Sequence, residues 1–146
     1  MFGQNDVAPR DWNAEGWREN ERYLYGVDLF NFGYWWEAHA AWETLWQTTG
    51  RSEVAGRFLQ ALIQVAAALV QHRAGHTDGA RRLASKGLAK LRALSGELGP
   101  AGNHAILYMG VDVHGFAAAT EHFFESERPL EPVEIEEIGP PLLVLA

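Results

Sequence analysis

LFNFGYWWEAHAAWETLW, residues 29–46, gives the clearest indication of how this chain folds. Gly33 interrupts it after an apolar run, in the way a residue free to adopt positive φ ends a helix. From Trp35 onward the tryptophans recur at helical spacing, which predicts a second helix over about 35–48. The stretch therefore predicts two helices joined by a tight turn, an αα-hairpin.

The sequence on both sides of this hairpin continues in helical segments. We expect a first helix from Asn13, a good N-cap, to about Asn31. A further helix is expected from a cap at Ser52 to about Ala74, where Gly75 breaks it. The next helix is capped by Thr77 or Asp78 and reaches about Leu94. A loop over 95–111 and a last helix capped by Asp112 follow. Since no segment predicts paired strands, the predicted fold class is all-α: a compact bundle of about five helices built from two αα-hairpins, with an extended C-terminal tail.

Three regions follow from this pattern. Residues 1–12 are predicted to be a flexible N-terminal lead, residues 13–127 the helical bundle domain, and residues 128–146 an extended tail. Four prolines and an acidic run exclude further helix in the tail. Its apolar end, Leu142 to Leu145, is expected to dock on the body of the protein or on a neighbouring subunit, so a homo-oligomer formed through the tail is one expectation.

Composition excludes several classes of protein. The 146 residues include no cysteine, which removes disulfides and thiolate metal sites and fits a cytoplasmic protein. A net charge of −7 opposes nucleic-acid binding. The longest apolar stretch, Phe58 to Val70, is interrupted by Gln60 and Gln64, so we expect no membrane span. The basic residues of the fourth helix are expected to be a solvated face, since no aromatic side chains alternate with them.

The second helix carries the candidate site residues of the hairpin. At about 100° per residue, one face holds Trp35, His39, Trp42 and Trp46. Glu43 lies four residues after His39, so these two side chains are expected to meet. Glu37 lies nearly opposite His39, and the pair therefore cannot chelate one metal ion on a regular helix.

The third helix is expected to be central, because apolar residues cover well over half of its circumference. Its remaining arc is a polar stripe of Arg57, Gln60, Gln64 and Gln71, with His72 at the margin. Either this stripe faces water, or it faces His39 and Glu43 across a polar seam between the second and third helices. A buried seam requires its members to form hydrogen bonds with one another.

These residues resemble a prokaryotic family known as domain of unknown function 309. The resemblance rests on GVDLFN at 26–31, GYWWEAH at 33–39, Trp42-Glu43, Trp46, RFLQALIQVAAA at 57–68, His72 and Gly79-Ala80, and it covers about residues 20–90. The family usually has His-Glu where this chain has His39-Ala40, and Gly where Ala61 stands. The resemblance implies a compact helical bundle and no established activity.

From these residues we favour a non-catalytic binding or interaction module with a structural polar seam. The candidate ligand-binding residues are His39, Glu43, Trp42, Trp46, Arg57, Gln60 and Gln64, with Asp28, Glu37 and His72 as secondary candidates. No catalytic residue and no cofactor is predicted, and the partner is an unidentified protein or small molecule. The alternatives are a metal-dependent hydrolase with a divalent metal, or a small-anion-binding protein, that uses His39, Glu43 and Arg57.

Overall fold

The structure is a computed structural model, and it describes residues 12–50, 53–99, 107–125 and 139–146. Its elements in chain order are the 3-10 helix η1 (Ala14–Glu19), α1 (Glu21–Asn31), α2 (Trp35–Trp46), α3 (Val54–Arg73), α4 (Thr77–Leu98), β1 (Leu107–Tyr108), β2 (Val111–Asp112) and α5 (Val113–Glu125). The predicted all-α bundle of about five helices is confirmed.

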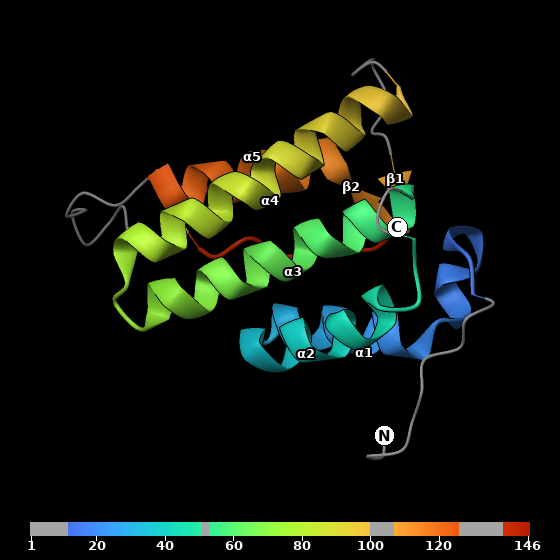
Figure 1. Ribbon diagram of the computed structural model, residues 1–146, viewed down its shortest axis with the longest axis horizontal. Coiled ribbons are helices and arrows are strands. Elements are labelled where there is room, and N and C mark those ends of the chain that lie inside the picture. The colour runs from blue at the N-terminus through green and yellow to red at the C-terminus, as the bar shows by residue number, and fades with distance from the viewer. Residues whose placement is uncertain (1–11, 51–52, 100–106, 126–138) are drawn as a thin grey trace.

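The α3 helix lies at the centre of the bundle (Figure 1). The α1–α2 hairpin packs along one side of α3, while α4 and then α5 cover the other side. The largest fully buried side chains include Tyr23 and Phe30 of α1, Trp42 of α2 and Phe58 of α3. Both predicted αα-hairpins are therefore present, and Gly33 and Gly75 end α1 and α3 with φ of 85° and 84°.

The predicted first helix is wrong in one respect, because it is two helices. Asn13 does cap η1, since its Oδ1 accepts a hydrogen bond from the Gly16 amide at 2.8 Å. The chain then leaves the helical conformation at Asn20 (φ −87°, ψ 92°), whose side chain accepts from the Tyr23 amide at 3.0 Å. Asparagine caps a helix in this way by replacing a backbone acceptor with its own side chain. Asn20 therefore begins α1 in a new direction.

The chain after α3 differs from expectation at two places. The N-cap of α4 is His76 rather than Thr77 or Asp78, and α4 continues to Leu98 instead of ending near Leu94. The predicted loop contains a two-residue antiparallel hairpin, β1–β2, whose turn places Met109 at φ 49° and Gly110 at φ 82°. Strands this short carry no periodic signal in a sequence.

Other predicted caps and segments had mixed outcomes. The predicted cap at Asp112 is confirmed, since its Oδ1 accepts from the Gly115 amide at 3.0 Å. The predicted cap at Ser52 is wrong, because the N-cap of α3 is the next residue, Glu53, whose side chain forms no capping hydrogen bond. Most of the predicted N-terminal lead and residues 126–138 lie outside the described residues.

Length and composition alone would allow α3 to cross a membrane, contrary to the expectation from residues 58–70. The helix has 20 residues, and the mean hydropathy of its most apolar window is 1.4. A single such helix is weak evidence, since the core helix of a soluble protein meets the same criterion. Here 56% of that window is buried inside the fold, where α3 packs between the two helical layers.

The α1 and α2 helices approach each other closely at Gly26. The indole of Trp42 is fully buried and lies against the Gly26 backbone, where an added Cβ would be 2.2 Å from Trp42 Nε1. The same Nε1 donates a hydrogen bond to the Tyr23 carbonyl oxygen at 3.3 Å. Only glycine leaves the room that this approach requires.

The described part of the tail, residues 139–146, is extended and docks on its own chain. The Asn31 side chain donates to the Leu143 carbonyl and accepts from the Leu143 amide, both at 2.8 Å. Leu143 is 2% exposed, and the Ala146 amide donates to the Gly110 carbonyl at 2.9 Å. Docking on the body is one of the two expected arrangements, and a homo-oligomer formed through the tail stays a prediction.

Replacement of Gly26 by alanine tests the close approach. We expect Gly26→Ala to lower the free energy of unfolding in urea by about 2 kcal/mol, because the new methyl group displaces the Trp42 ring. Gly96→Ala is the matched control: Gly96 is also inside a helix, but a Cβ there meets nothing within 4 Å. The control should gain about 0.5–1 kcal/mol from helix propensity. Equal effects at the two positions would contradict the role assigned to Gly26.

Removal of the Asn31 side chain tests the docking of the tail. We expect Asn31→Ala to lower the free energy of unfolding by about 1–3 kcal/mol, because the Leu143 amide and carbonyl both lose their partner. Asn31→Asp keeps the acceptor for the Leu143 amide but places a carboxylate oxygen against the Leu143 carbonyl, so it should also lower the free energy of unfolding. An alanine variant as stable as the parent protein would show that the tail does not depend on this side chain.

Candidate functional site

His39 and Glu43 meet as the sequence predicts. His39 Nδ1 lies 3.6 Å from Glu43 Oε2, and the imidazole stacks on the Trp36 indole with ring centres 5.3 Å apart and planes 6° apart. Both side chains are partly exposed, and Glu37 is exposed to solvent. These contacts all lie within α2, so His39 and Glu43 form a local pair on the surface of one helix.

The predicted seam between the second and third helices is wrong, because its α3 members bond to α4. Arg57 donates to both carboxylate oxygens of Glu97, at 2.5 and 3.1 Å, and Gln64 accepts from Lys90 Nζ at 3.0 Å. Hydrogen bonding to Arg57 holds the pKa of Glu97 below its ordinary value. The α3 stripe therefore lies along the α3–α4 edge of the bundle, and Gln60 is a partly exposed member of the same stripe.

The other candidates are also dispersed. Trp42 is fully buried in the core, while Trp46 is only partly buried. His72 packs edge-on against Phe123 of α5, with ring centres 4.8 Å apart, and Asp28 is exposed on α1. Across the described residues, no three His, Asp or Glu side chains lie close enough together to hold a metal ion. The structure thus brings together only His39 and Glu43 of the proposed ligands.

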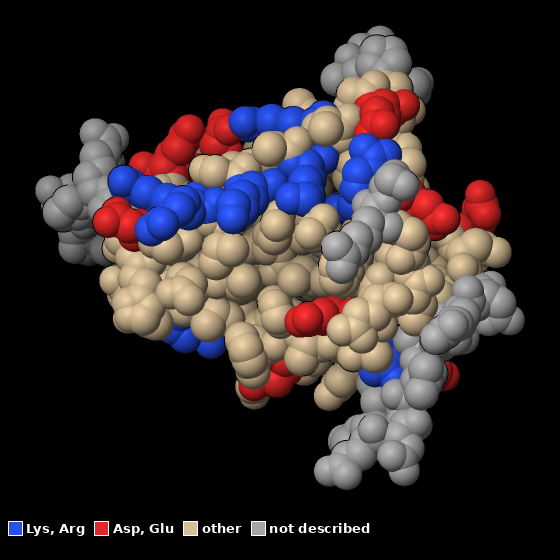
Figure 2. Space-filling model, viewed as in Figure 1, with Lys and Arg blue, Asp and Glu red and all other residues tan. Residues whose placement is uncertain are grey.

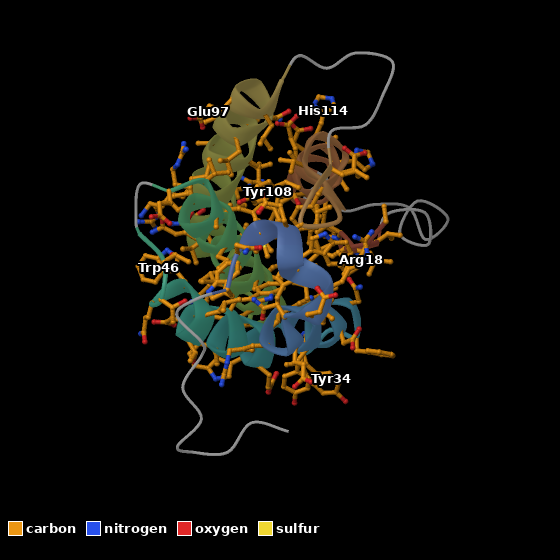
Figure 3. All side chains as sticks on the ribbon, turned by 90° about the vertical axis from the view of Figure 1, so that its right-hand side faces the viewer. Arg18, Tyr34, Trp46, Glu97, Tyr108 and His114 are labelled. Carbon is orange, nitrogen blue, oxygen red and sulfur yellow. The ribbon has the colours of Figure 1, made fainter. Side chains whose placement is uncertain are left out.

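Sequence reasoning missed a group of exposed aromatic side chains at the α1–α2 turn. Phe32, Tyr34 and Trp36 are 80%, 58% and 62% exposed. We call these three residues the aromatic turn, and Figure 3 shows Tyr34 pointing away from the body of the molecule there. The available signal is the adjacent pair Trp35-Trp36: two neighbours on a helix cannot share one face, so one of them must leave the core.

The aromatic turn is part of a larger apolar surface. In the described part of the chain, every exposed large apolar side chain except Leu107 lies on α1, on the turn or on the tail docked beside α1. The members outside the turn are Tyr25, Leu142 and Val144. Leu142 and Val144 flank Leu143, which is bonded to Asn31, the residue before Phe32. A concentration of exposed apolar side chains of this kind is typical of a site where another molecule binds.

The backbone of the turn is fixed from α3. Arg73 Nη2 donates to the Gly33 carbonyl at 2.7 Å, and its guanidinium lies 3.9 Å from the centre of the buried Trp35 ring. The Tyr34 amide also donates to the Leu29 carbonyl at 2.8 Å. Because these bonds hold the backbone of the turn, the backbone loses little conformational entropy when the turn binds a partner.

Acidic residues accompany the apolar ones on the exposed face of α1. Glu21, Tyr25, Asp28 and Phe32 follow one another at intervals of three or four residues, and all four are exposed. Such spacing places them on one helix face. Glu37 adds a further exposed carboxylate at the start of α2. The apolar surface therefore has an acidic rim on α1 and at the start of α2, interrupted at the turn by the exposed guanidinium of Arg73.

Arg73 provides a test of the rigidity of the turn. We expect Arg73→Ala to cost about 1 kcal/mol of stability and to speed hydrogen exchange at the Tyr34 amide, because the stacking on Trp35 and the bond to Gly33 are both lost. Arg73→Lys should restore only part of the stability and of the protection at Tyr34, since an ammonium group lacks the planar, forked geometry of a guanidinium. Arg82→Ala, at an exposed position on α4, is the control and should leave exchange at Tyr34 unchanged. Unchanged exchange in Arg73→Ala would contradict this role.

Comparison with known proteins identifies the part of the chain that builds the hairpin and the central helix. No curated protein matches the chain. One family model does match, over residues 23–83, which run from Tyr23 in α1 through α2 and α3 into α4. Residues 23–83 are therefore similar to the family described as Domain of unknown function (DUF309).

Proposed function

We propose that this chain is a non-catalytic protein-binding domain, and that it contacts its partner through the apolar surface at the α1–α2 turn. The observation that carries the proposal is the concentration of exposed large apolar side chains there, on a backbone fixed by Arg73. The family match is consistent with this role and assigns no activity.

The residue types support binding to protein rather than to a small molecule. Trp and Tyr contribute most to the energy of many protein interfaces, because they bury a large area with few rotatable bonds. Trp36 and Tyr34 are side chains of this kind and both are exposed, and Figure 3 shows Tyr34 projecting away from the body of the molecule. Small-molecule sites are concave and enclose most of the ligand surface.

The rim favours a partner with basic groups. Asp28 on α1 and Glu37 on α2 are exposed beside the aromatic turn. Carboxylates at the edge of an interface steer a positively charged surface toward it. We therefore expect a partner that presents apolar side chains flanked by Lys or Arg.

The alternative anion or metal site on His39, Glu43 and Arg57 has less support. The Arg57 guanidinium is bonded to Glu97 of α4, whereas His39 contacts Trp36 and Glu43 of α2. The three side chains thus have different neighbours. A binding site requires its polar groups to converge on one ligand.

Photo-crosslinking in the native host tests the proposal. With p-benzoylphenylalanine in place of Trp36, we expect a discrete adduct with a partner protein. The matched control carries the same amino acid in place of Leu107, the exposed apolar residue outside the surface, and should give no such adduct. Absence of an adduct at position 36, or the same adduct at both positions, would overturn the proposal.

The purified partner then allows a quantitative test. Tyr34→Ser combined with Trp36→Ser should weaken its affinity at least about tenfold, because each aromatic hot spot contributes about 2 kcal/mol or more. Stability should change by less than about 0.5 kcal/mol, since both side chains are exposed. Leu107→Ser should leave the affinity unchanged. Equal affinity of the double variant and the parent protein would contradict the assigned surface.

A further inference from the structure

A shallow groove on the opposite layer of the molecule has a different chemical character. It lies between α3 and α4, has a volume of about 300 Å³, and is lined by Arg57, Lys86, Ala89, Lys90 and Ala93. Three of the five lining residues are cationic, and the other two are alanines that leave open space between the cations. Figure 2 shows Lys and Arg side chains gathered in a row along α4.

The cations of the groove have few acidic partners. Arg57 is paired with Glu97, while Lys90 donates to the neutral Gln64 amide oxygen. Lys86 has no partner within the part of the chain that the structure describes. Lys86 and Lys90 are also four residues apart on one helix, where like charges repel. Two of the three cations, Lys86 and Lys90, are thus without an acidic partner among the described residues.

The local charge contrasts with that of the whole chain. The chain has 12 basic and 19 acidic residues and a net charge of −7. Five of the basic residues lie on α4, together with only two acidic ones, Asp78 and Glu97. A basic strip on an acidic protein produces a local positive potential, which attracts an anionic partner while the rest of the surface repels it.

We propose that this groove binds an extended acidic segment of a partner polypeptide whose carboxylates occupy alternate positions. Residues four apart on a helix, such as Lys86 and Lys90, are displaced by about 6 Å along its axis. Alternate residues of an extended chain are displaced by about 6.6 Å and point to the same side. The spacing of successive carboxylates in such a segment therefore matches the spacing of Lys86 and Lys90 along the helix axis. Ala89 and Ala93 leave room for the backbone of the segment.

A further cation lies at each end of the row formed by Lys86 and Lys90. Arg82 precedes Lys86 by four residues and continues the row at the N-terminal side of α4. Arg57 lies at the other end, where its guanidinium already holds the carboxylate of Glu97 in two hydrogen bonds. A carboxylate of the partner competes with Glu97 for Arg57. The pair therefore limits the affinity of the groove.

The same features disfavour two other anionic ligands. No aromatic side chain lines the groove, whereas sites for single-stranded nucleic acid stack bases on aromatic rings. A site for a small phosphate gathers its donors around one point, whereas these cations are spread along a helix. Nucleic acid and inorganic polyphosphate are therefore alternative outcomes of the test.

Fluorescence anisotropy with labelled peptides tests the proposal on the full chain at low salt. The probe is Gly-Glu-Ser-Glu-Ser-Glu-Gly, and its isomer Gly-Ser-Ser-Glu-Glu-Glu-Gly carries the same charge in a different register. We expect the alternating peptide to bind more tightly than the isomer. Absence of binding, or equal affinity for the two peptides, would overturn the proposal, as would tighter binding of an oligothymidylate or of tripolyphosphate than of the alternating peptide.

Matched variants locate the binding on the molecule. Lys86→Gln with Lys90→Gln should weaken binding of the alternating peptide about tenfold, since both lysine–carboxylate ion pairs are lost. Arg81→Gln with Arg92→Gln removes the same charge from another face of α4 and should change the affinity less than about twofold. Glu97→Gln should strengthen binding, because it releases Arg57. Equal losses in the two double variants would show a bulk charge effect and contradict the groove.

Discussion

The packing of the Trp42 indole against Gly26 sets the spacing of α1 and α2, and the rest of the structure depends on this contact. Trp42 donates to the Tyr23 carbonyl, and the Tyr23 hydroxyl donates to the Met109 carbonyl at 2.8 Å. Burial raises the pKa of Tyr23, so the hydroxyl keeps its proton and remains a donor. Phe30 extends the contact to Phe116 of α5, with ring centres 5.9 Å apart. One close approach thus aligns α2, α1, the β-hairpin and α5.

This arrangement leaves two faces with different chemistry. The inner side of the α1–α2 hairpin is filled by Trp35 and Trp42, while Phe32, Tyr34 and Trp36 remain exposed at its turn. The far layer presents the basic residues of α4 (Figure 2). Apolar side chains and charged side chains bind by different means, burial in one case and electrostatic attraction in the other. The two proposed surfaces can therefore act independently of each other.

The fold was largely predictable from the sequence, because long helices and the glycines that end them carry strong local signals. Asn20 was missed because an asparagine inside an apolar pattern does not reveal whether it caps a helix or lies within one. The polar stripe with Arg57 and Gln64 was identified, but the helix that it contacts was not. Which helix a stripe faces is known only after the flanking helices have been placed. Local periodicity contains no information on that placement.

The candidate site was predicted less well than the fold. His39 and Glu43 meet, as expected for side chains four residues apart, yet the exposed aromatic turn was not recognised. A tryptophan in a sequence indicates burial, and six of them in one chain suggest a large core. Only the helix phase around Trp35 and Trp36 shows that one of these residues faces outward, and this phase depends on where α2 begins.

Solvent exposure of the individual tryptophans distinguishes the two sides of the α1–α2 hairpin, because Trp42 is buried inside it and Trp36 is exposed outside it. Fluorine NMR of protein labelled with 5-fluorotryptophan reports this exposure as the shift of each resonance between H2O and D2O. We expect a large H2O-to-D2O shift of the Trp36 resonance and no shift of the Trp42 resonance. Each resonance is assigned by a Trp→Phe variant. A protected Trp36, or a Trp42 that responds to solvent, would contradict this arrangement of the hairpin.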